Sequence, residues 1–232
     1  MFQKLSIIGI LAAAAAAGGH FVLFALRAGG PDKSGSPLIK RFTLWERFVI
    51  VVTFGSLLAL AATGFLAAVQ GVAMSGYLLM LHVTFAPPFI LGLLAMVATW
   101  AHDCRYESHD LRWVIGRGCL KCGRDLPAGR FDPPQKTYLW ILAAAGIVLS
   151  LSAALSMVRL ADTYWQELLY EIHRYTALGL VVVTILHLYY CTLARPGAWW
   201  VLLTGSVRLN WAKRYHPLWA TEFMPEDIVP SE

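Results

Sequence analysis

The stretch YEIHRYTALGLVVVTILHLYYCTLARP, residues 170–196, holds two histidines, His173 and His187, fourteen residues apart in one of the most apolar parts of the chain. In an α-helix this step returns to within about 40° of the same face and rises about 21 Å. One helix would therefore present two imidazoles on one side, each at the depth of a different bilayer leaflet. An ionisable side chain in lipid is costly unless it has a partner, so such residues indicate function. Two histidines stacked in this way suit two haem groups, one above the other.

The composition around this stretch is that of a membrane protein. Of the 232 residues 58% are hydrophobic and only 14% are charged. No alternating strand pattern competes with the apolar runs. The sequence predicts an all-α membrane protein with five transmembrane helices. The predicted helices are five runs of about 20 apolar residues, Leu5–Leu26, Trp45–Val69, Gly76–Ala101, Thr137–Met157 and Leu169–Leu193.

The first of these runs resembles a secretory signal, because Lys4 precedes an alanine-rich apolar stretch. We expect it to be retained as a helix. The chain then divides into an extra N-terminal helix with its loop (1–40), a four-helix bundle (41–195) and a tail (196–232).

The basic residues predict the orientation of the five helices. The segments 27–47, 102–136 and 195–232 hold 16 of the 19 lysines and arginines. Because basic residues stay on the cytoplasmic side, we expect the N-terminus outside the bacterial inner membrane, and loop 102–136 and the tail in the cytoplasm. This asymmetry accounts for the net charge of +5, so no nucleic-acid partner is needed.

Four histidines lie at two depths of the predicted bundle. Counted from the helix ends at about 1.5 Å per residue, His82 and His173 share the outer depth, and His20 and His187 share the inner depth. A low-spin haem iron takes two axial ligands from opposite faces, and imidazole is a common choice. Two such pairs would bind two haem groups. The alternative for any single histidine, strongest for His20, is a polar contact or close packing between helices without a ligand role.

Several motifs resemble one family, the cytochrome b subunit of membrane-bound formate dehydrogenases and related hydrogenases. Between residues 41 and 219 they are RFTLWERF, ATGF, GRFDPPQK, HRY, HLYY, ARPG and WAKRYHPLW, in that order. The resemblance implies a four-helix haem-binding bundle that passes electrons between an iron-sulfur partner and membrane quinone. The substrate, formate or hydrogen, would belong to a separate catalytic subunit. The last helix of this family carries one ligand for each b haem, which matches His173 and His187, and the second outer ligand matches His82.

The chain departs from this family at the remaining ligand. The family places it early in the RFTLWERF helix, where residues 48–52 read FVIVV and offer none. We hypothesise that His20, on the extra helix, replaces it and pairs with His187. The alternative is a protein with a single haem.

The anionic haem propionates need cations or hydrogen-bond donors near the membrane surface. Arg174, beside His173, is the candidate on the outer side, and Arg47 and Arg195 are candidates on the inner side. Each of the three is equally explained as a boundary charge that sets the topology.

The resemblance also implies a quinone site beside the inner haem, near an asparagine of the family in the loop that GRFDPPQK matches. This chain has Asp132 at that place, and a carboxylate can accept a proton during quinol chemistry. Asp before Pro is also an ordinary loop pairing. Lys136 and His102 are weaker candidates for the same site.

Loop 102–136 carries a separate signal, the sequence Cys119-Leu120-Lys121-Cys122-Gly123. Two cysteines at this spacing are a common half of a zinc or iron site, which Cys104 or His109 would complete. The alternative functions are a quinone-linked membrane thiol oxidoreductase that uses this motif, and an assembly or transport protein without a cofactor. The first needs its cysteines on the oxidising side of the membrane, and the second leaves the level-matched histidines unexplained.

Overall fold

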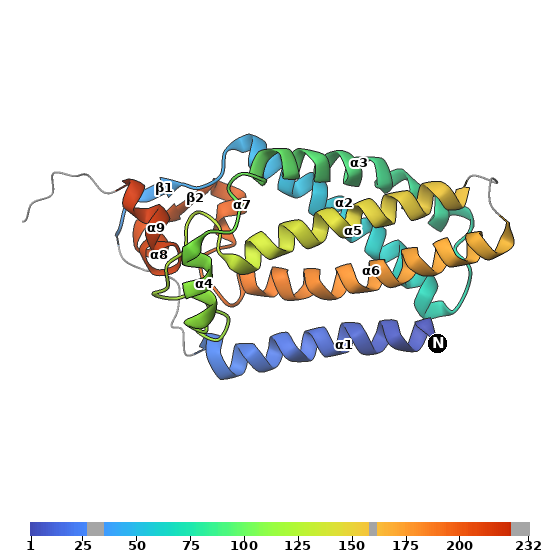
Figure 1. The fold of residues 1–232 in the computed structure, drawn as a ribbon, viewed down its shortest axis with the longest axis horizontal. Helices are drawn as coiled ribbons and strands as arrows, with labels where there is room; N and C mark the ends of the chain where they lie inside the picture. The colour runs from blue at the N-terminus through green and yellow to red at the C-terminus, as the bar shows by residue number, and fades with distance from the viewer. Residues whose placement is uncertain (27–34, 158–161, 224–232) are drawn as a thin grey trace, which may run out of the picture.

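The computed structural model describes residues 1–26, 35–157 and 162–223, which form a bundle of five long helices with a cap at one end (Figure 1). All five helices are long and apolar enough to cross a membrane, which confirms the predicted fold class. They are α1 (Phe2–His20, continued by the π-helical turn η1, Phe21–Ala25), α2 (Leu44–Gln70), α3 (Gly76–Trp100), α5 (Pro133–Met157) and α6 (Thr163–Thr192).

The RFTLWERF motif begins helix α2 with a capping box. The Thr43 hydroxyl accepts from the backbone N–H of Glu46 at 3.2 Å, and the Glu46 carboxylate accepts from the N–H of Thr43 at 2.7 Å. Such a pair satisfies two donors that the first turn of a helix would leave without partners. The helix ends at Gly71, whose φ of 67° is the left-handed conformation that glycine adopts readily.

Helices α5 and α6 begin before the predicted positions, because their caps lie in the polar residues that precede the apolar runs. Asp132 accepts from the N–H of Gln135 at 3.1 Å, and the Gln135 side chain accepts from the N–H of Asp132 at 3.2 Å. At α6 the Asp162 carboxylate accepts from the N–H of Trp165 at 3.1 Å. Proline residues in the first turn of α5 suit a helix start, since the missing N–H would have no partner there.

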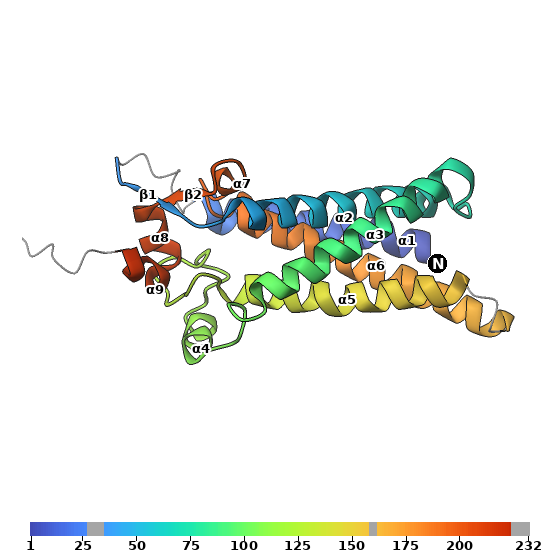
Figure 2. The same cartoon turned by 90° about the horizontal axis from the view of Figure 1, so that it is seen from above.

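The long helices pack as neighbours that small residues bring close together. Helix α2 lies beside α3, α5 lies beside α6, and α1 lies along the opposite side of α6 (Figures 1 and 2). A Cβ on Gly92 of α3 would lie 2.6 Å from the Thr53 hydroxyl and 3.2 Å from the Thr53 backbone on α2. On α5, Gly146 leaves room for a side chain of α3, because a Cβ at Gly146 would lie 2.2 Å from the Leu93 side chain.

The cap covers the end of the bundle opposite the N-terminus (Figure 1). Two short antiparallel strands in it pair Ile39 with Val207, a small sheet that the sequence did not predict. The elements of the cap are β1 (Leu38–Lys40), α4 (Ser108–Ile115), α7 (Trp200–Thr204), β2 (Ser206–Arg208), α8 (Leu209–Tyr215), α9 (Pro217–Ala220) and the 3-10 turn η3 (Thr221–Phe223).

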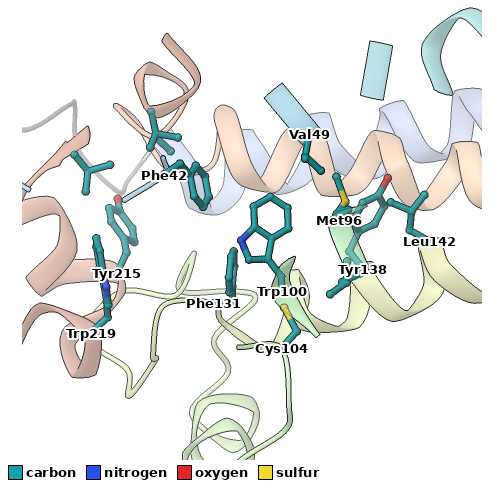
Figure 3. Packing of buried hydrophobic residues seen from close by; sticks show 14 of the residues in the cluster. Phe42, Val49, Met96, Trp100, Cys104, Phe131, Tyr138, Leu142, Tyr215 and Trp219 are labelled. Carbon is teal, nitrogen blue, oxygen red and sulfur yellow. The ribbon is translucent and has the colours of Figure 1, made fainter. Parts of the chain in front are cut away.

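The described part of the tail is packed onto the bundle. Trp211, Tyr215 and Trp219 belong to the same buried cluster as residues of α2, α3 and α5. In this cluster Trp100, at the end of α3, lies between residues of the bundle and Phe131 (Figure 3). Since one core runs from the bundle into the cap, the residues of the cap are positioned rigidly against the helix ends.

Glu46 joins three segments at this junction. Its carboxylate accepts from the indole N–H of Trp100 at 2.9 Å and from Arg130 at 2.6 Å. Arg130 also pairs with Asp103 at 2.9 Å. One buried carboxylate therefore holds together the start of α2, the end of α3 and the GRFDPPQK segment. This contact explains why the RFTLWERF motif has Glu46 and the GRFDPPQK motif has Arg130.

Candidate functional site

The structure brings together the two histidines that were predicted to share the outer depth. His82 on α3 and His173 on α6 are neighbours, with their ring centres 6.4 Å apart and their ring planes at 66°. They come from two different helices, and both are partly shielded from solvent.

Hydrogen bonds hold each imidazole of this pair by its Nδ1 atom. The Thr63 hydroxyl donates to the carbonyl of Ala59 at 2.8 Å, so its oxygen accepts from Nδ1 of His82, also at 2.8 Å. Nδ1 of His173 lies 3.1 Å from the carbonyl oxygen of Leu149 and 3.1 Å from the Ser152 hydroxyl. A carbonyl only accepts, so Nδ1 of His173 carries the proton. In both rings Nε2 is left with its lone pair, the arrangement that orients histidine ligands of metals.

The spacing of the pair fits one metal ion between the rings. An imidazole nitrogen binds a metal at about 2.0 Å, and each nitrogen lies about 1.1 Å from its ring centre, which predicts ring centres about 6.2 Å apart. The separation of 6.4 Å agrees with this value. The residues therefore fit an iron with two axial histidines, as in a b haem.

His187, the inner histidine of α6, faces a cavity of about 540 Å³ between α2, α3, α5 and α6. Its ring stacks on Tyr138 with the centres 3.7 Å apart. Most of the wall is apolar, and Gly55 on α2 has open space where a Cβ would lie. Among the described residues of the wall His187 is the only histidine, and the other polar or charged side chains include Arg41, Gln135 and Arg195.

The structure does not bring His20 and His187 together. Nδ1 of His20 lies 2.6 Å from the hydroxyl of Tyr189, and Nε2 lies 2.9 Å from the carbonyl oxygen of Cys119. Residues 187 and 189 are about 200° apart around a helix, and α1 packs on the side of α6 that carries Tyr189. His20 thus lies at the expected depth, but it packs against the face of α6 that carries Tyr189 and not the face that carries His187. Both of its ring nitrogens have partners there.

Asp132 lies behind the wall of the cavity. Its side chain is fully buried, caps α5, forms an ion pair with Arg195 and accepts from the Tyr190 hydroxyl at 3.2 Å. Despite the cost of burial, this carboxylate raises the pKa of Arg195. Its neighbour Gln135 does line the cavity, so a role of Asp132 toward a ligand there would pass through Gln135 and Arg195.

His216 completes this buried network. Its Nδ1 donates to the carbonyl of Gly129 at 2.9 Å, and Nε2 lies 3.4 Å from Arg195. Burial, followed by the charges of Arg41 and Arg195, holds the pKa of His216 well below its usual 6.5. The ring is therefore neutral and accepts a hydrogen bond from Arg195.

The two weaker quinone candidates lie away from the cavity. The ammonium of Lys136 is buried against Asp110 at 2.8 Å and the carbonyl of Arg105 at 2.9 Å, where it ties α4 to α5. The His102 side chain is 82% exposed beside Asp103. Neither side chain belongs to the described cavity wall.

Arg174 forms an ion pair with Glu171 one turn earlier on α6. Its guanidinium also lies over the ring of Phe2 at 4.8 Å. These contacts account for the residue as a boundary charge that links α6 to α1, and a role toward a propionate stays a prediction.

The predicted zinc site is not formed among the described residues. No three histidine, cysteine or acidic side chains of these residues gather in an arrangement that could hold a metal ion. The reason is that Cys104 packs in the core beside Trp100, whereas Cys122 is buried in a separate cluster and Cys119 is exposed. Burial raises the pKa of Cys104 to about 12 and also raises the pKa of Cys119 and Cys122, which disfavours thiolate chemistry.

The sequence alone did not identify the residues that orient the histidines or those that line the cavity. Thr63 and Ser152 are hydroxyl residues inside apolar helices, a signal that marks polar contacts between helices. Arg41 and Trp211 belong to quoted motifs, but only the packing of the tail against the start of α2 makes them neighbours.

One protein family and several known proteins are similar to this chain. Residues 41–205 match the family model described as prokaryotic cytochrome b561. The cytochrome b556(Fdn) subunit of the nitrate-inducible formate dehydrogenase of Escherichia coli (strain K12) is 22% identical over 155 residues, which cover 61% of this chain and 68% of that subunit. The corresponding subunit of Shigella flexneri gives the same values.

Proposed function

The chain belongs to the prokaryotic cytochrome b561 family, and we propose that this membrane cytochrome b connects an iron-sulfur subunit of a respiratory oxidoreductase complex to membrane quinone. The similar subunit of Escherichia coli is part of a formate dehydrogenase, which supports formate as the substrate of a partner catalytic subunit. The five apolar helices support anchoring in the bacterial inner membrane. The distribution of basic residues supports an N-terminus on the outer side.

The observation that carries this proposal is the His82–His173 pair. A b haem bound there supplies reversible transfer of one electron. Thr63 holds His82 by a 2.8 Å hydrogen bond, and Leu149 holds His173 by a 3.1 Å hydrogen bond, so both rings are held in a fixed orientation. Rigid ligands reduce the rearrangement that accompanies a change in the charge of the iron.

We propose a second redox centre in the cavity at His187, where a haem would have His187 as the only histidine ligand that the described wall supplies. The fourteen-residue step from His173 to His187 separates the two ligands by about 21 Å along α6, which is about two thirds of the roughly 30 Å thickness of the hydrocarbon core. Electrons would pass from the outer haem to this inner centre and reach quinone at the end of the bundle that carries the cap. His20 is not part of the ligand set that we propose, because its two ring nitrogens bind Tyr189 and the backbone of Cys119.

At the quinone end we propose that Asp132 acts as a positioning residue. It fixes Gln135 through the capping box and Arg195 through an ion pair, and both of these side chains reach the cavity. Quinone reduction takes up two protons, so polar groups at this end serve proton delivery. Lys136 would act at a distance, by holding α4 against the start of α5.

Haem counting on the purified chain tests the outer ligands. The changes His82→Ala and His173→Ala should each remove one haem per chain, whereas His20→Ala should leave the count unchanged. His102→Ala is the matched control, because that side chain is 82% exposed and lies beside Asp103. A full complement of haem in both ligand variants would refute the assignment.

A second experiment tests the connection to quinone. Quinol added to membranes that contain the protein should reduce the b haem, as followed by its visible spectrum. The change Gln135→Ala should slow this reduction, while chemical reduction by dithionite stays complete. Equal rates of quinol reduction in the variant and the unchanged protein would argue against a quinone site at this end.

A further inference from the structure

Two buried hydrogen-bond donors at the cap end of the inner cavity have no partner. The side chains of Arg41 and Trp211 both line the cavity and are 5% and 6% exposed. Neither Nε of Arg41 nor Nε1 of Trp211 makes a hydrogen bond. The two groups are adjacent, since the guanidinium of Arg41 lies 5.0 Å from the centre of the Trp211 ring. Burying a donor without a partner is unfavourable, so this arrangement favours an acceptor at this place.

The charge at this place favours an anionic acceptor. Arg195 is paired with Asp132 and Arg130 is paired with Glu46. Arg41 donates through Nη2 to the carbonyl of Arg130 at 3.0 Å, but no ion pair of the described residues includes it. Burial and the nearby charge of Arg195 lower the pKa of Arg41 to about 9, so the group is still a cation at neutral pH. A buried cation is stable only when an opposite charge or a set of acceptors offsets the loss of water.

The rest of the cavity restricts the ligand to one with an apolar body. Its wall is mostly apolar and its volume is about 540 Å³. It contains one histidine, His187, whose Nε2 lies 3.6 Å from the sulfur of Cys191, a weak partner that a metal ion can replace. Gly55 leaves open space on the wall, where a flat group can approach the backbone of α2. A neutral quinone would satisfy the donors but would not offset the charge of Arg41.

We propose that Arg41 and Trp211 bind the carboxylate of a haem propionate, with the haem in the inner cavity and its iron on His187. This inference rests on the proposed function as a haem protein and adds the residues that select the haem by its carboxylate. The two arginines that the sequence suggested for this role are otherwise engaged. Arg47 donates to the backbone of Leu202 and Leu203, and Arg195 donates to Asp132.

The test compares haem with its dimethyl ester, which keeps the macrocycle and lacks the carboxylates. The full chain, produced in cells that cannot synthesise haem and held in detergent micelles, is titrated with each compound while the visible spectrum reports binding. We expect two equivalents of haem to bind, and the inner equivalent to bind at least about tenfold more weakly as the ester, because the ester loses its charged hydrogen-bond acceptor. The change His187→Ala identifies the inner equivalent.

Variants assign this preference to the two residues. Arg41→Met should bind haem and ester equally at the inner site, and Trp211→Phe should reduce the preference. Arg112→Gln, an exposed arginine of the cap, is the matched control and should keep the preference of the unchanged chain. The ester titration of the unchanged chain tests the proposal even if Arg41→Met fails to fold.

Three results would overturn the inference. They are equal inner affinities for haem and ester in the unchanged chain, a preserved preference in both variants, and binding of only one equivalent of haem that His187→Ala leaves intact. The last result would leave the outer haem and the proposed function standing. Failure of the chain to bind any haem would instead refute the proposed function itself.

Discussion

Replacing Asp132 by asparagine removes one negative charge from the buried network at the start of α5. Asp132 and Arg195 are 0% and 1% exposed in their side chains, so water does not screen their ion pair. Breaking such a pair by removing one partner costs about 3–5 kcal/mol, because the other charge stays buried. Asparagine is as good an N-cap as aspartate, so the capping of α5 is retained. We expect Asp132→Asn to lower the free energy of unfolding by about 3 kcal/mol.

Asp132→Ala should lower the free energy of unfolding further than Asp132→Asn does, because alanine also loses the hydrogen bond to the N–H of Gln135 at 3.1 Å. Loss of an N-cap adds about 1 kcal/mol. The double change Asp132→Asn with Arg195→Met should restore part of the loss, since neither charge is then left alone. This recovery would measure the coupling between the two residues.

The assay is unfolding of the detergent-solubilised chain by added dodecyl sulfate, followed by the loss of helical circular dichroism. Asp103→Asn is the matched control. Its partner Arg130 is 26% exposed and Asp103 itself is 32% exposed, so this change should cost less than about 1 kcal/mol. If Asp132→Asn cost no more than Asp103→Asn, the argument from the buried charge would be refuted.

Other contacts in the structure give three more predictions. Thr63→Val removes the acceptor that holds Nδ1 of His82 at 2.8 Å, so the outer haem should bind about 10- to 100-fold more weakly in a haem titration, and an unchanged affinity would contradict the orienting role. The pKa of His216 is held below 6.5 in the folded state, so the unfolded chain takes up a proton that the folded chain does not. Stability should therefore be complete above pH 6.5 and fall below it by up to about 1.4 kcal/mol per pH unit, a slope that His216→Gln should reduce in unfolding experiments at several pH values. Gly92→Ala places a Cβ 2.6 Å from the Thr53 hydroxyl and should destabilise the α2–α3 contact by about 1–3 kcal/mol, whereas Gly179→Ala, with nothing within 4 Å, should not lower the thermal midpoint.

Most of the helix positions were predictable, because a membrane requires long apolar runs and the chain has five of them. The largest errors are at the starts of α5 and α6, which lie in polar residues before those runs. There the caps Asp132 and Asp162 extend each helix beyond its apolar part. The sheet between β1 and β2 was missed, because three-residue strands have too short a pattern to detect and depend on the tail folding back.

The height of each histidine along its helix was predictable, but the neighbour that each histidine contacts was not. Counting residues at about 1.5 Å each placed His82 level with His173, and the two rings lie 6.4 Å apart. The same counting placed His20 level with His187, but His20 contacts Tyr189 on another face of α6. A residue count measures height along a helix, whereas the side from which a neighbouring helix approaches depends on packing with the whole bundle.

The amino-acid sequence by itself determined the membrane class, the five helices, the histidines of α3 and α6 and their levels, because these follow from hydropathy and from the rise of a helix. Only the tertiary structure decided which nitrogen of each imidazole is free, that His20 is engaged elsewhere, and that Arg41 and Trp211 share the end of a cavity. Hydrogen-bond partners and buried charges arise from contacts between segments far apart in the chain. Local pattern carries no information about such contacts until the segments are packed together.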